Sequence, residues 1–147
     1  NINGNTYEVA VRPADLLLDV LREQLNLTAA KPGCLNGDCG ACTIIMDGWP
    51  AKSCLILAVE AEGHSILTVE GLGGTAAIQK SFVEANAFQC GYCTSGFLMV
   101  CHALKIQHPT LPEEYVIEEW LQSNICRCTS YQEIRKAVHL MYELESN

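Results

Sequence analysis

The sequence predicts an α+β protein in which a small β-rich half precedes an all-helical half. Strand and tight-turn signals are confined to residues 1–72, helical periodicity dominates from Thr75 onward, and three glycines between positions 71 and 74 separate the two parts. At 147 residues the chain has the length of one ordinary domain or of two small ones. We therefore expect two domains, residues 1–73 and residues 74–147.

The β-rich half is expected to contain a hairpin, a helix and two further strands. Asn3-Gly4 is a hairpin signal, flanked by Ile2 and by the alternating Tyr7, Val9 and Val11. Asp15 is a plausible N-cap for a helix to Leu25, in which apolar residues recur at helical spacing and form one core-facing stripe. The remaining elements are a strand Thr43–Met46 ending in the turn Asp47-Gly48, a short helix over 51–60 and a strand Ile66–Val69.

The helical half is expected to form four helices, at about 75–87, 94–107, 113–123 and 130–145. Cys101 lies among apolar residues of the second of these and is expected to be a buried, inert thiol. Trp49 and Trp120 are expected to act as packing or interface anchors. Four acidic residues between Leu111 and Glu119 indicate a solvated helix face.

Composition and charge exclude several classes of protein. Hydrophobic residues make up 49% of the chain and charged residues 18%, which excludes intrinsic disorder. A formal net charge of −8 argues against nucleic acid or an anionic membrane surface as a partner. The longest nearly apolar stretch, Gly96 to Ile106, is too short for a bilayer span, which needs about 20 apolar residues. No leader pattern precedes the first expected strand, so we expect a cytoplasmic protein without membrane insertion.

The nine cysteines give the first indication of function, because they are grouped. A stretch of 35 residues without cysteine separates the two groups. The first group is Cys34, Cys39, Cys42 and Cys54, the second is Cys90, Cys93, Cys126 and Cys128, and Cys101 lies outside both motifs.

The first group has the spacing C-x4-C-x2-C-x11-C, whose first two intervals match the plant-type ferredoxin ligands of a [2Fe-2S] cluster. Such a cluster is anionic, and only a tightly curled loop can point successive backbone N–H groups at its sulfides. Gly33, Gly37 and Gly40 permit that curl, because glycine adopts positive φ angles at no steric cost. A four-cysteine zinc site and a disulfide pair are the alternatives, although zinc ligands usually come as two short pairs and the cysteine count is odd.

The second group pairs Cys90-Gly91-Tyr92-Cys93 with Cys126-Arg127-Cys128, and each motif lies just before an expected helix. The partial positive charge and free N–H groups of a helix N-terminus stabilise thiolates and a cluster that gains negative charge on reduction. A second [2Fe-2S] cluster is the preferred interpretation, with zinc as the alternative. A Rieske centre is excluded, because no histidine lies within either motif.

With these motifs the sequence resembles the iron–sulfur subunit of the xanthine oxidase (molybdenum hydroxylase) family. The resemblance covers almost the whole chain and rests on residues 33–43 (GCLNGDCGACT), 53–55 (SCL), 89–94 (QCGYCT) and 124–129 (NICRCT). It implies a plant-type ferredoxin (β-grasp) fold followed by a four-helix bundle. It further implies that the helical-half cluster lies beside a molybdopterin cofactor, that the other cluster passes electrons toward FAD, and that Gln89 and Cys128 contact the pterin.

The chain departs from the family pattern at a few positions, none of which is a ligand. Ser95 stands where the family commonly has Pro, and Ser123 and Ser130 stand where it has Gly. Residues 75–77 replace a Leu-His-Pro sequence with Thr-Ala-Ala. Ser95 and Ser130 can serve as helix N-caps, so we expect both helix starts to be kept.

The expected function is electron transfer by two [2Fe-2S] clusters, from a molybdopterin site toward a flavin in a hydroxylase or dehydrogenase complex. No motif holds a catalytic constellation, and the chain has no room for the other cofactors. We therefore expect a hetero-oligomer with a molybdopterin-binding large subunit and an FAD-binding medium subunit. The alternatives are a free-standing ferredoxin, which needs no stable partner, and a structural module with two zinc ions. The sequence does not specify the substrate or the final electron acceptor.

Overall fold

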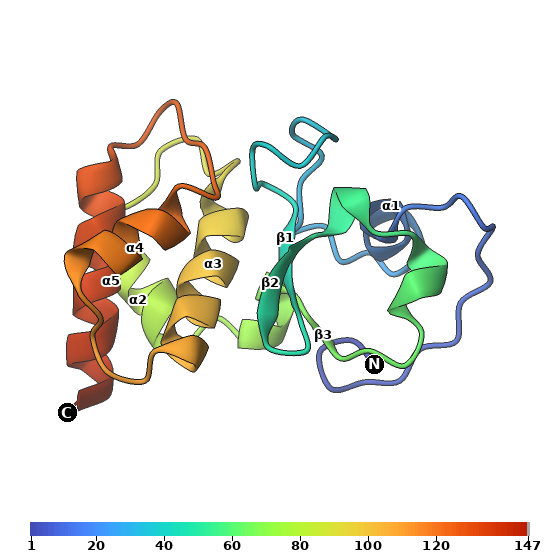
Figure 1. The fold of residues 1–147 in the computed structure, drawn as a ribbon, viewed down its shortest axis with the longest axis horizontal. Coiled ribbons are helices and arrows are strands. Elements are labelled where there is room, and N and C mark those ends of the chain that lie inside the picture. Colours follow the sequence, from blue (N-terminus) through green and yellow to red (C-terminus); the bar gives the residue numbers. More distant parts are fainter. Residues whose placement is uncertain (147) are drawn as a thin grey trace.

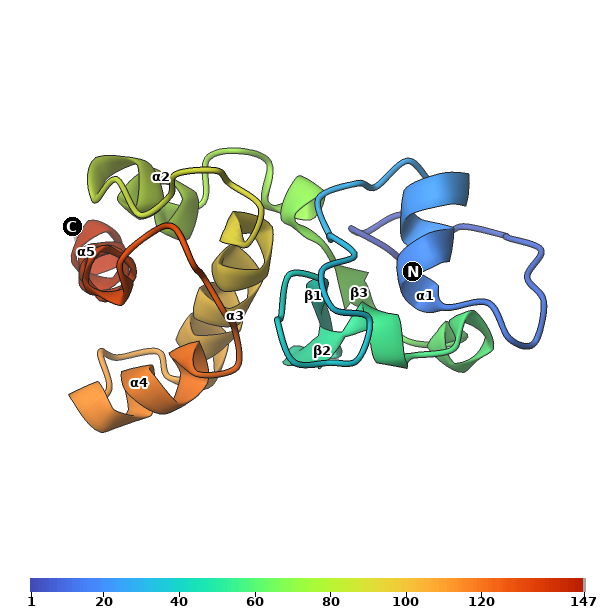
Figure 2. The same ribbon diagram turned by 90° about the horizontal axis from the view of Figure 1, so that it is seen from above.

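The β-rich half and the helical half lie next to each other along the long axis of the molecule (Figure 1). The structure is a computed structural model and describes residues 1–146. Helix α3 (Thr94–Gln107) packs directly on strand β1 (Thr43–Met46), so it lies between the sheet and the other helices (Figures 1 and 2). The expected α+β class is confirmed.

The sheet has three antiparallel strands in the order β2-β1-β3. Strand β2 is Trp49–Lys52 and strand β3 is Ile66–Leu67. The turn between β1 and β2 is the expected Asp47-Gly48, with φ angles of 50° and 86°, as a hairpin turn of the primed type requires. The helix expected over residues 51–60 is wrong, because this turn reverses the chain and residues 49–52 pair along β1 instead. Two short 3-10 helices follow, Ser53–Leu55 and Ala58–Ala61.

The N-terminal segment adds only isolated bridges to the sheet. Ile2 pairs with Asn5 across the expected Asn3-Gly4 turn, and it also pairs with Ile66 of β3. The strand expected through residues 7–11 is wrong. These residues have no strand partner in the described chain, and the Tyr7 side chain is exposed, so their alternating pattern does not correspond to a buried face.

Helix α1 is shorter than expected and begins later. It spans Leu17–Asp19 and continues as a π-helical turn, Val20–Gln24. The expected cap at Asp15 is wrong: the N-cap position is Leu16, and the Asp15 carboxylate instead accepts hydrogen bonds from Arg12 N (2.8 Å) and Nε (2.9 Å). The apolar stripe nevertheless forms the core of this half, where Leu17, Leu18 and Leu21 are buried.

Four helices form the second half, as expected. They are α2 (Ala77–Glu84), α3, α4 (Glu114–Leu121) and α5 (Tyr131–Ser146). Their shared core contains the fully buried side chains of Phe82, Phe97, Ile117 and Ile134. Cys101 belongs to this core with an exposed fraction of 0%, and burial raises the pKa of its thiol, so the expectation of a buried, inert cysteine agrees with its position.

The chain crosses from one half to the other through the 3-10 helix Val69–Leu72 and the glycines that follow it. The strand expected over Ile66–Val69 is therefore shorter, because β3 ends at Leu67 and the 3-10 helix begins at Val69. Gly73 and Gly74 have left-handed φ angles of 69° and 78°, which glycine adopts without strain. The division of the chain at residue 73 stays a prediction.

Aromatic and ionic contacts tie the elements together. Trp49 of β2 stacks on Trp120 of α4 with ring centroids 6.4 Å apart, so the two tryptophans pack across the two halves. The acidic face of α4 is not purely solvated, because Glu118 pairs with Arg135 and Glu114 with His139 of α5.

The two expected helix caps differ in outcome. Ser130 Oγ accepts a hydrogen bond from Gln132 N in the first turn of α5, which confirms its role as a cap. Ser95 is not a cap, because α3 begins one residue earlier at Thr94 and Ser95 Oγ is buried inside the first turn.

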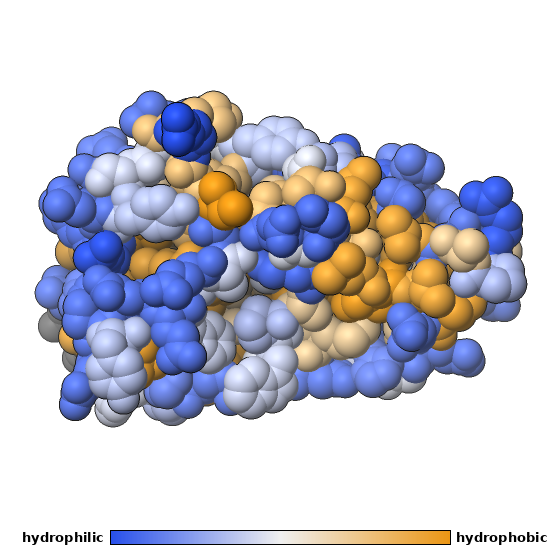
Figure 3. All heavy atoms as spheres, turned by 45° about the horizontal axis from the view of Figure 1, so that its top comes forward, coloured by the Kyte–Doolittle hydropathy of each residue, from blue (hydrophilic) through white to orange (hydrophobic). Residues whose placement is uncertain are grey.

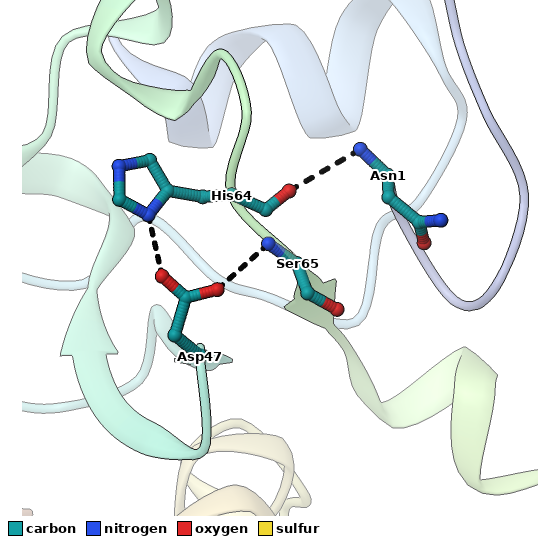
Figure 4. Close-up of polar contacts among 4 residues, drawn as sticks. All are labelled: Asn1, Asp47, His64 and Ser65. Carbon is teal, nitrogen blue, oxygen red and sulfur yellow. Dashed lines mark hydrogen bonds and ion pairs between the residues drawn. The ribbon is translucent and has the colours of Figure 1, made fainter.

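Asp47 fixes the hairpin turn to the start of β3 (Figure 4). Its carboxylate lies 2.5 Å from His64 Nδ1 and accepts a hydrogen bond from Ser65 N at 2.9 Å. These two contacts, the histidine first, lower the pKa of Asp47. The N-terminal amine of Asn1 donates to the carbonyl of His64 on the same side (Figure 4).

We predict that Asp47→Asn lowers stability at neutral pH but not in acid. Because the folded-state pKa of Asp47 is lowered, its carboxylate contributes to the free energy of unfolding above its unfolded-state pKa of about 3.9. This contribution is lost as the pH falls through the folded-state pKa. Chemical denaturation of wild type and variant across a pH series measures this. Glu8→Gln, which removes an exposed carboxylate from the irregular segment, is the control. A stability difference that persists unchanged in acid would contradict the assignment.

Candidate metal centres

The first cysteine group lies in a curled loop, residues 33–42, whose backbone amides point at sulfur. Cys34 Sγ accepts hydrogen bonds from Asn36 N (3.5 Å) and Cys39 N (3.3 Å), and Cys39 Sγ accepts one from Ala41 N (3.5 Å). These amides, that of Cys39 first, lower the pKa of Cys34 to about 7. The loop therefore favours the thiolate form of Cys34.

Glycine is required in this loop for two different reasons. Gly37 and Gly40 have φ angles of 90° and 70°, in the left-handed region. Gly33 needs space instead, because a Cβ there would lie 2.5 Å from Cys39 Sγ. The expected curl is present, and the backbone at Gly33 lies so close to Cys39 Sγ that a side chain there would clash with the sulfur.

Cys42 and Cys54 complete the first group from beneath the loop. Both are buried, and Cys54 comes from the 3-10 helix after β2. Burial, and then the contact with Cys42, raise the pKa of Cys54 to about 11. Burial lowers the pKa of Lys52, and the negative charge of all four sulfurs, Cys42 foremost, opposes this larger effect.

The second group also comes together, although its two motifs are 32 residues apart. The Cys93 and Cys126 side chains interact with each other, and so do those of Cys128 and Cys90. Burial, followed by the contact with Cys126, raises the pKa of Cys93 to about 12. Although burial opposes it, the Cys93 thiol and the N–H of Thr129, which lies 3.2 Å from Cys126 Sγ, lower the pKa of Cys126.

The second group is more open to solvent than the first. Cys93 occupies the N-cap position of α3, and the Cys126–Cys128 motif ends just before α5, as expected from the sequence. Cys90 and Cys128 are exposed, and so is Gln89 beside Cys90. One edge of this group can therefore be reached from outside the chain.

The two groups are joined by a direct backbone contact. The carbonyl oxygen of Cys39, a member of the first group, accepts a hydrogen bond from Ile125 N at 3.0 Å. Ile125 directly precedes Cys126 of the second group. Tyr92, which lies between Cys90 and Cys93, donates its hydroxyl to Pro32 O at 3.1 Å. In Figure 1 the cysteine-bearing loops of both halves lie along the same upper edge of the molecule.

Three residues of this junction were not singled out from the sequence. Asn124 is 1% exposed and donates from Nδ2 to Gly40 O at 3.2 Å. The Tyr131 hydroxyl accepts from Cys126 N at 3.0 Å and donates to Asn124 O at 3.2 Å. Lys52 donates to Asn124 Oδ1 at 2.9 Å. The positions of Lys52 and Asn124, each two residues before a motif cysteine, are the only signal that the sequence offered.

The donor set fits anionic clusters. Each group offers four sulfurs, and backbone N–H groups point at sulfur in both, as sulfide-rich clusters require. Across residues 1–146 no three Cys, His, Asp or Glu side chains are arranged to hold a single metal ion.

No helix in this part of the chain has both the length and the apolar character needed to cross a bilayer.

Comparison with protein families gives two matches that together cover residues 1–139. Residues 1–67 match the family described as "2Fe-2S iron-sulfur cluster binding domain". Residues 68–139 match the family described as "[2Fe-2S] binding domain".

Similar full-length proteins are subunits of dehydrogenases. The chain is 48% identical to caffeine dehydrogenase subunit gamma of Pseudomonas sp. (strain CBB1), over 93% of this chain and 85% of that protein. It is 41% identical to the nicotinate dehydrogenase small FeS subunit of Eubacterium barkeri, over 100% of this chain and 95% of that protein.

Solved structures give the same result for the fold. Quinoline 2-oxidoreductase from Pseudomonas putida 86 superposes with a TM-score of 0.92 at 43% identity, over 99% of this chain and 92% of that one. The aldehyde oxidoreductase of Desulfovibrio desulfuricans superposes with a TM-score of 0.93 at 38% identity, and there this chain spans only 17% of the larger polypeptide. The expected order, a β-grasp ferredoxin domain followed by a helical domain, is confirmed.

We predict that Cys126→Ser disorders the helical half more than Cys101→Ser does. A bound metal centre contributes folding free energy on the order of 10 kcal/mol, comparable with a domain's net stability of about 5 to 15 kcal/mol. Cys126 connects two distant motifs, whereas Cys101→Ser only buries a hydroxyl, at a cost of about 1 to 3 kcal/mol. Limited proteolysis of the metal-loaded proteins measures the difference, and equal sensitivity of the two variants would count against it.

Proposed function

The chain belongs to the molybdenum hydroxylase family as a small iron–sulfur subunit, and from this premise we propose that it relays electrons from a molybdopterin site toward a flavin, both bound by other subunits. Electron transfer is the role of such a subunit. The observation that carries the proposal is the pair of four-cysteine sets joined by the hydrogen bond from Ile125 N to Cys39 O.

We assign the first [2Fe-2S] cluster to Cys34, Cys39, Cys42 and Cys54, and the second to Cys90, Cys93, Cys126 and Cys128. When bound, these clusters supply one-electron redox chemistry. The assignment is supported by the amides that point at Cys34 and Cys126 and by the contacts between Cys93 and Cys126 and between Cys90 and Cys128. Residues 1–73 and 74–147 are then the two cluster-binding domains.

The polypeptide itself holds the two ligand sets at a fixed separation. The Ile125–Cys39 hydrogen bond is backbone to backbone, so it does not depend on the rotamer of any side chain. The Tyr131 hydroxyl binds the Cys126 amide and the Asn124 carbonyl, which fixes the segment that leads into the second set. A fixed separation suits transfer between two centres, because no conformational change is needed between one electron and the next.

We further propose that the second set faces the molybdopterin-binding large subunit, with Gln89 and Cys128 against the pterin. Their exposure, together with that of Cys90, supports this orientation. The Gln89 amide offers both a donor and an acceptor to a polar pterin edge, and Cys128 sulfur can accept a weak hydrogen bond. The FAD-binding medium subunit then receives electrons from the first set.

An apolar surface near the cysteine loops supports stable association with other chains. The β-rich half exposes Leu35, Leu55, Leu57 and Val59, and Figure 3 shows apolar residues gathered over this half. Ile125 and Phe88 are exposed beside the second set. Exposed apolar residues that are grouped in this way mark contact surfaces.

A free-standing ferredoxin is not favoured, because the relatives are named as subunits. We propose a cytoplasmic location, because a reducing compartment protects a chain with nine cysteines from forming disulfides.

The assignment predicts four iron atoms and four acid-labile sulfides per chain. Because the first set lies in a curled loop with two of its four cysteines buried, and the second lies at two helix starts with two cysteines exposed, the two clusters should give distinct EPR signals and potentials. Metal analysis, sulfide analysis and EPR on the purified complex measure this. Stoichiometric zinc, or only two irons in a fully loaded preparation, would overturn the proposal.

Gln89→Ala tests the orientation. We predict that this variant assembles both clusters but slows reduction of the second cluster by substrate, or weakens retention of the pterin, because an amide contact is lost. Rapid mixing followed by EPR gives the rate, and cofactor analysis of the same sample gives the content. Gln24→Ala, an exposed glutamine of the other half, is the control. Wild-type reduction rates together with wild-type pterin content in Gln89→Ala would refute the contact.

A further inference from the structure

The ammonium of Lys52 lies half-buried where the two halves meet. Its Nζ donates hydrogen bonds to Ser123 O (2.7 Å), Asn124 Oδ1 (2.9 Å) and Thr43 Oγ1 (3.2 Å). All three acceptors are neutral. Thr43 follows Cys42 directly and Lys52 lies two residues before Cys54, whereas Ser123 and Asn124 lie in the segment that leads to Cys126 of the second set.

No carboxylate in the described part of the chain pairs with this charge, because none of the ion pairs of residues 1–146 involves Lys52. The groups whose charge acts on it are Cys42, Cys39, Cys54 and Cys34. Burial lowers the pKa of Lys52, while the negative charge of these sulfurs opposes that effect. A half-buried cation with only neutral hydrogen-bond partners is costly unless opposite charge lies near it. Here the opposite charge is the first ligand set.

We propose that Lys52 is the counter-charge of the first cluster and that it raises the reduction potential of this cluster relative to the second. The proposal rests on the ligand assignment made above. Reduction adds one electron, and therefore one negative charge, to the cluster held by these cysteines. A fixed ammonium nearby stabilises the reduced form more than the oxidised form. Lys52 thus favours transfer from the second cluster to the first.

The hydrogen bonds determine where this charge acts. Ser123 and Asn124 hold the ammonium at the junction, and its bond to Thr43, whose hydroxyl in turn donates to Gly40 O at 2.7 Å, connects it to the loop of the first set. Its removal should therefore affect one cluster far more than the other. A general loosening of the junction would instead affect both. At an effective dielectric constant of about 20, a unit charge within roughly 10 Å changes a one-electron equilibrium by on the order of tenfold.

The experiment is a redox titration of the purified complex, followed by EPR, at one pH and one ionic strength. Lys52→Gln removes the charge and keeps a hydrogen-bonding group, Lys52→Met removes both, and Lys52→Arg keeps the charge. Lys80→Gln, on the exposed surface of α2, is the matched control. The signal of the first cluster is identified as the one altered by Cys54→Ser.

We expect the neutral variants to shift the electron equilibrium between the clusters about tenfold toward the second, which is about 59 mV for a one-electron couple. The midpoint potential of the first cluster should fall, that of the second should stay, and Lys52→Arg and Lys80→Gln should resemble wild type. An unchanged first-cluster potential, or equal shifts of both clusters, would overturn the inference.

The remaining outcomes are also decisive. A fall in Lys52→Arg as large as that in Lys52→Gln would show that the geometry of the lysine matters and not its charge, and this overturns the inference. Loss of the first cluster from Lys52→Gln and Lys52→Met, but not from Lys52→Arg, would indicate a role in cluster assembly and would also overturn the inference. Absence of any [2Fe-2S] signal in the wild-type complex would overturn the proposed function itself, and is distinguishable from all of these.

Discussion

The close approach of the two halves depends on the buried side chain of Asn124. Its Nδ2 donates to Gly40 O, its Oδ1 accepts from Lys52, and its own carbonyl accepts from Tyr131. The helix α3 and the first cysteine loop leave room for it only because residues 40 and 96 are glycines: a Cβ at Gly96 would lie 2.7 Å from Asn124 Nδ2, and one at Gly40 would overlap the same side chain. A buried amide must satisfy its hydrogen-bonding groups, so this arrangement permits little variation in how the halves meet.

The same contact determines how both cysteine sets are held. Gly40 lies between Cys39 and Cys42 of the first set, and Asn124 lies two residues before Cys126 of the second. The peptide that follows Asn124 makes the hydrogen bond to Cys39 O. A displacement at the junction would therefore move ligands of both sets together. The stacked pair Trp49 and Trp120 joins β2 to α4 at a second point, which restricts rotation of one half against the other.

The sequence was sufficient for features that depend on local spacing. The grouping of cysteines, the curl around Gly37 and Gly40, the four helices and the helix start at Ser130 follow from short-range patterns, and the structure contains each of them. Features that depend on which partner a segment finds in the fold were not predictable. Residues 49–52 pair with β1 across the hairpin turn although the segment from 51 onward has a helical composition, and residues 7–11 alternate like a strand although no strand among residues 1–146 pairs with them. Lys52 and Asn124 gain their roles from contacts across about 70 residues of sequence.

The electrostatic asymmetry of the two sets follows from where each one lies. The first is enclosed by a curled loop with Cys42 and Cys54 buried, and it adjoins the half-buried cation of Lys52. The second receives fewer inward amides and exposes Cys90 and Cys128. In a chain with a formal net charge of −8, the general field disfavours added electrons at either set, so the local groups decide between them. On the proposed assignment, the amides and the ammonium at the first set would stabilise an added electron there, and the exposed edge of the other set would allow a neighbouring subunit to reach it. The proposed relay then has its entry at the second set and its exit at the first, and the backbone contact between the sets means that it needs no conformational change.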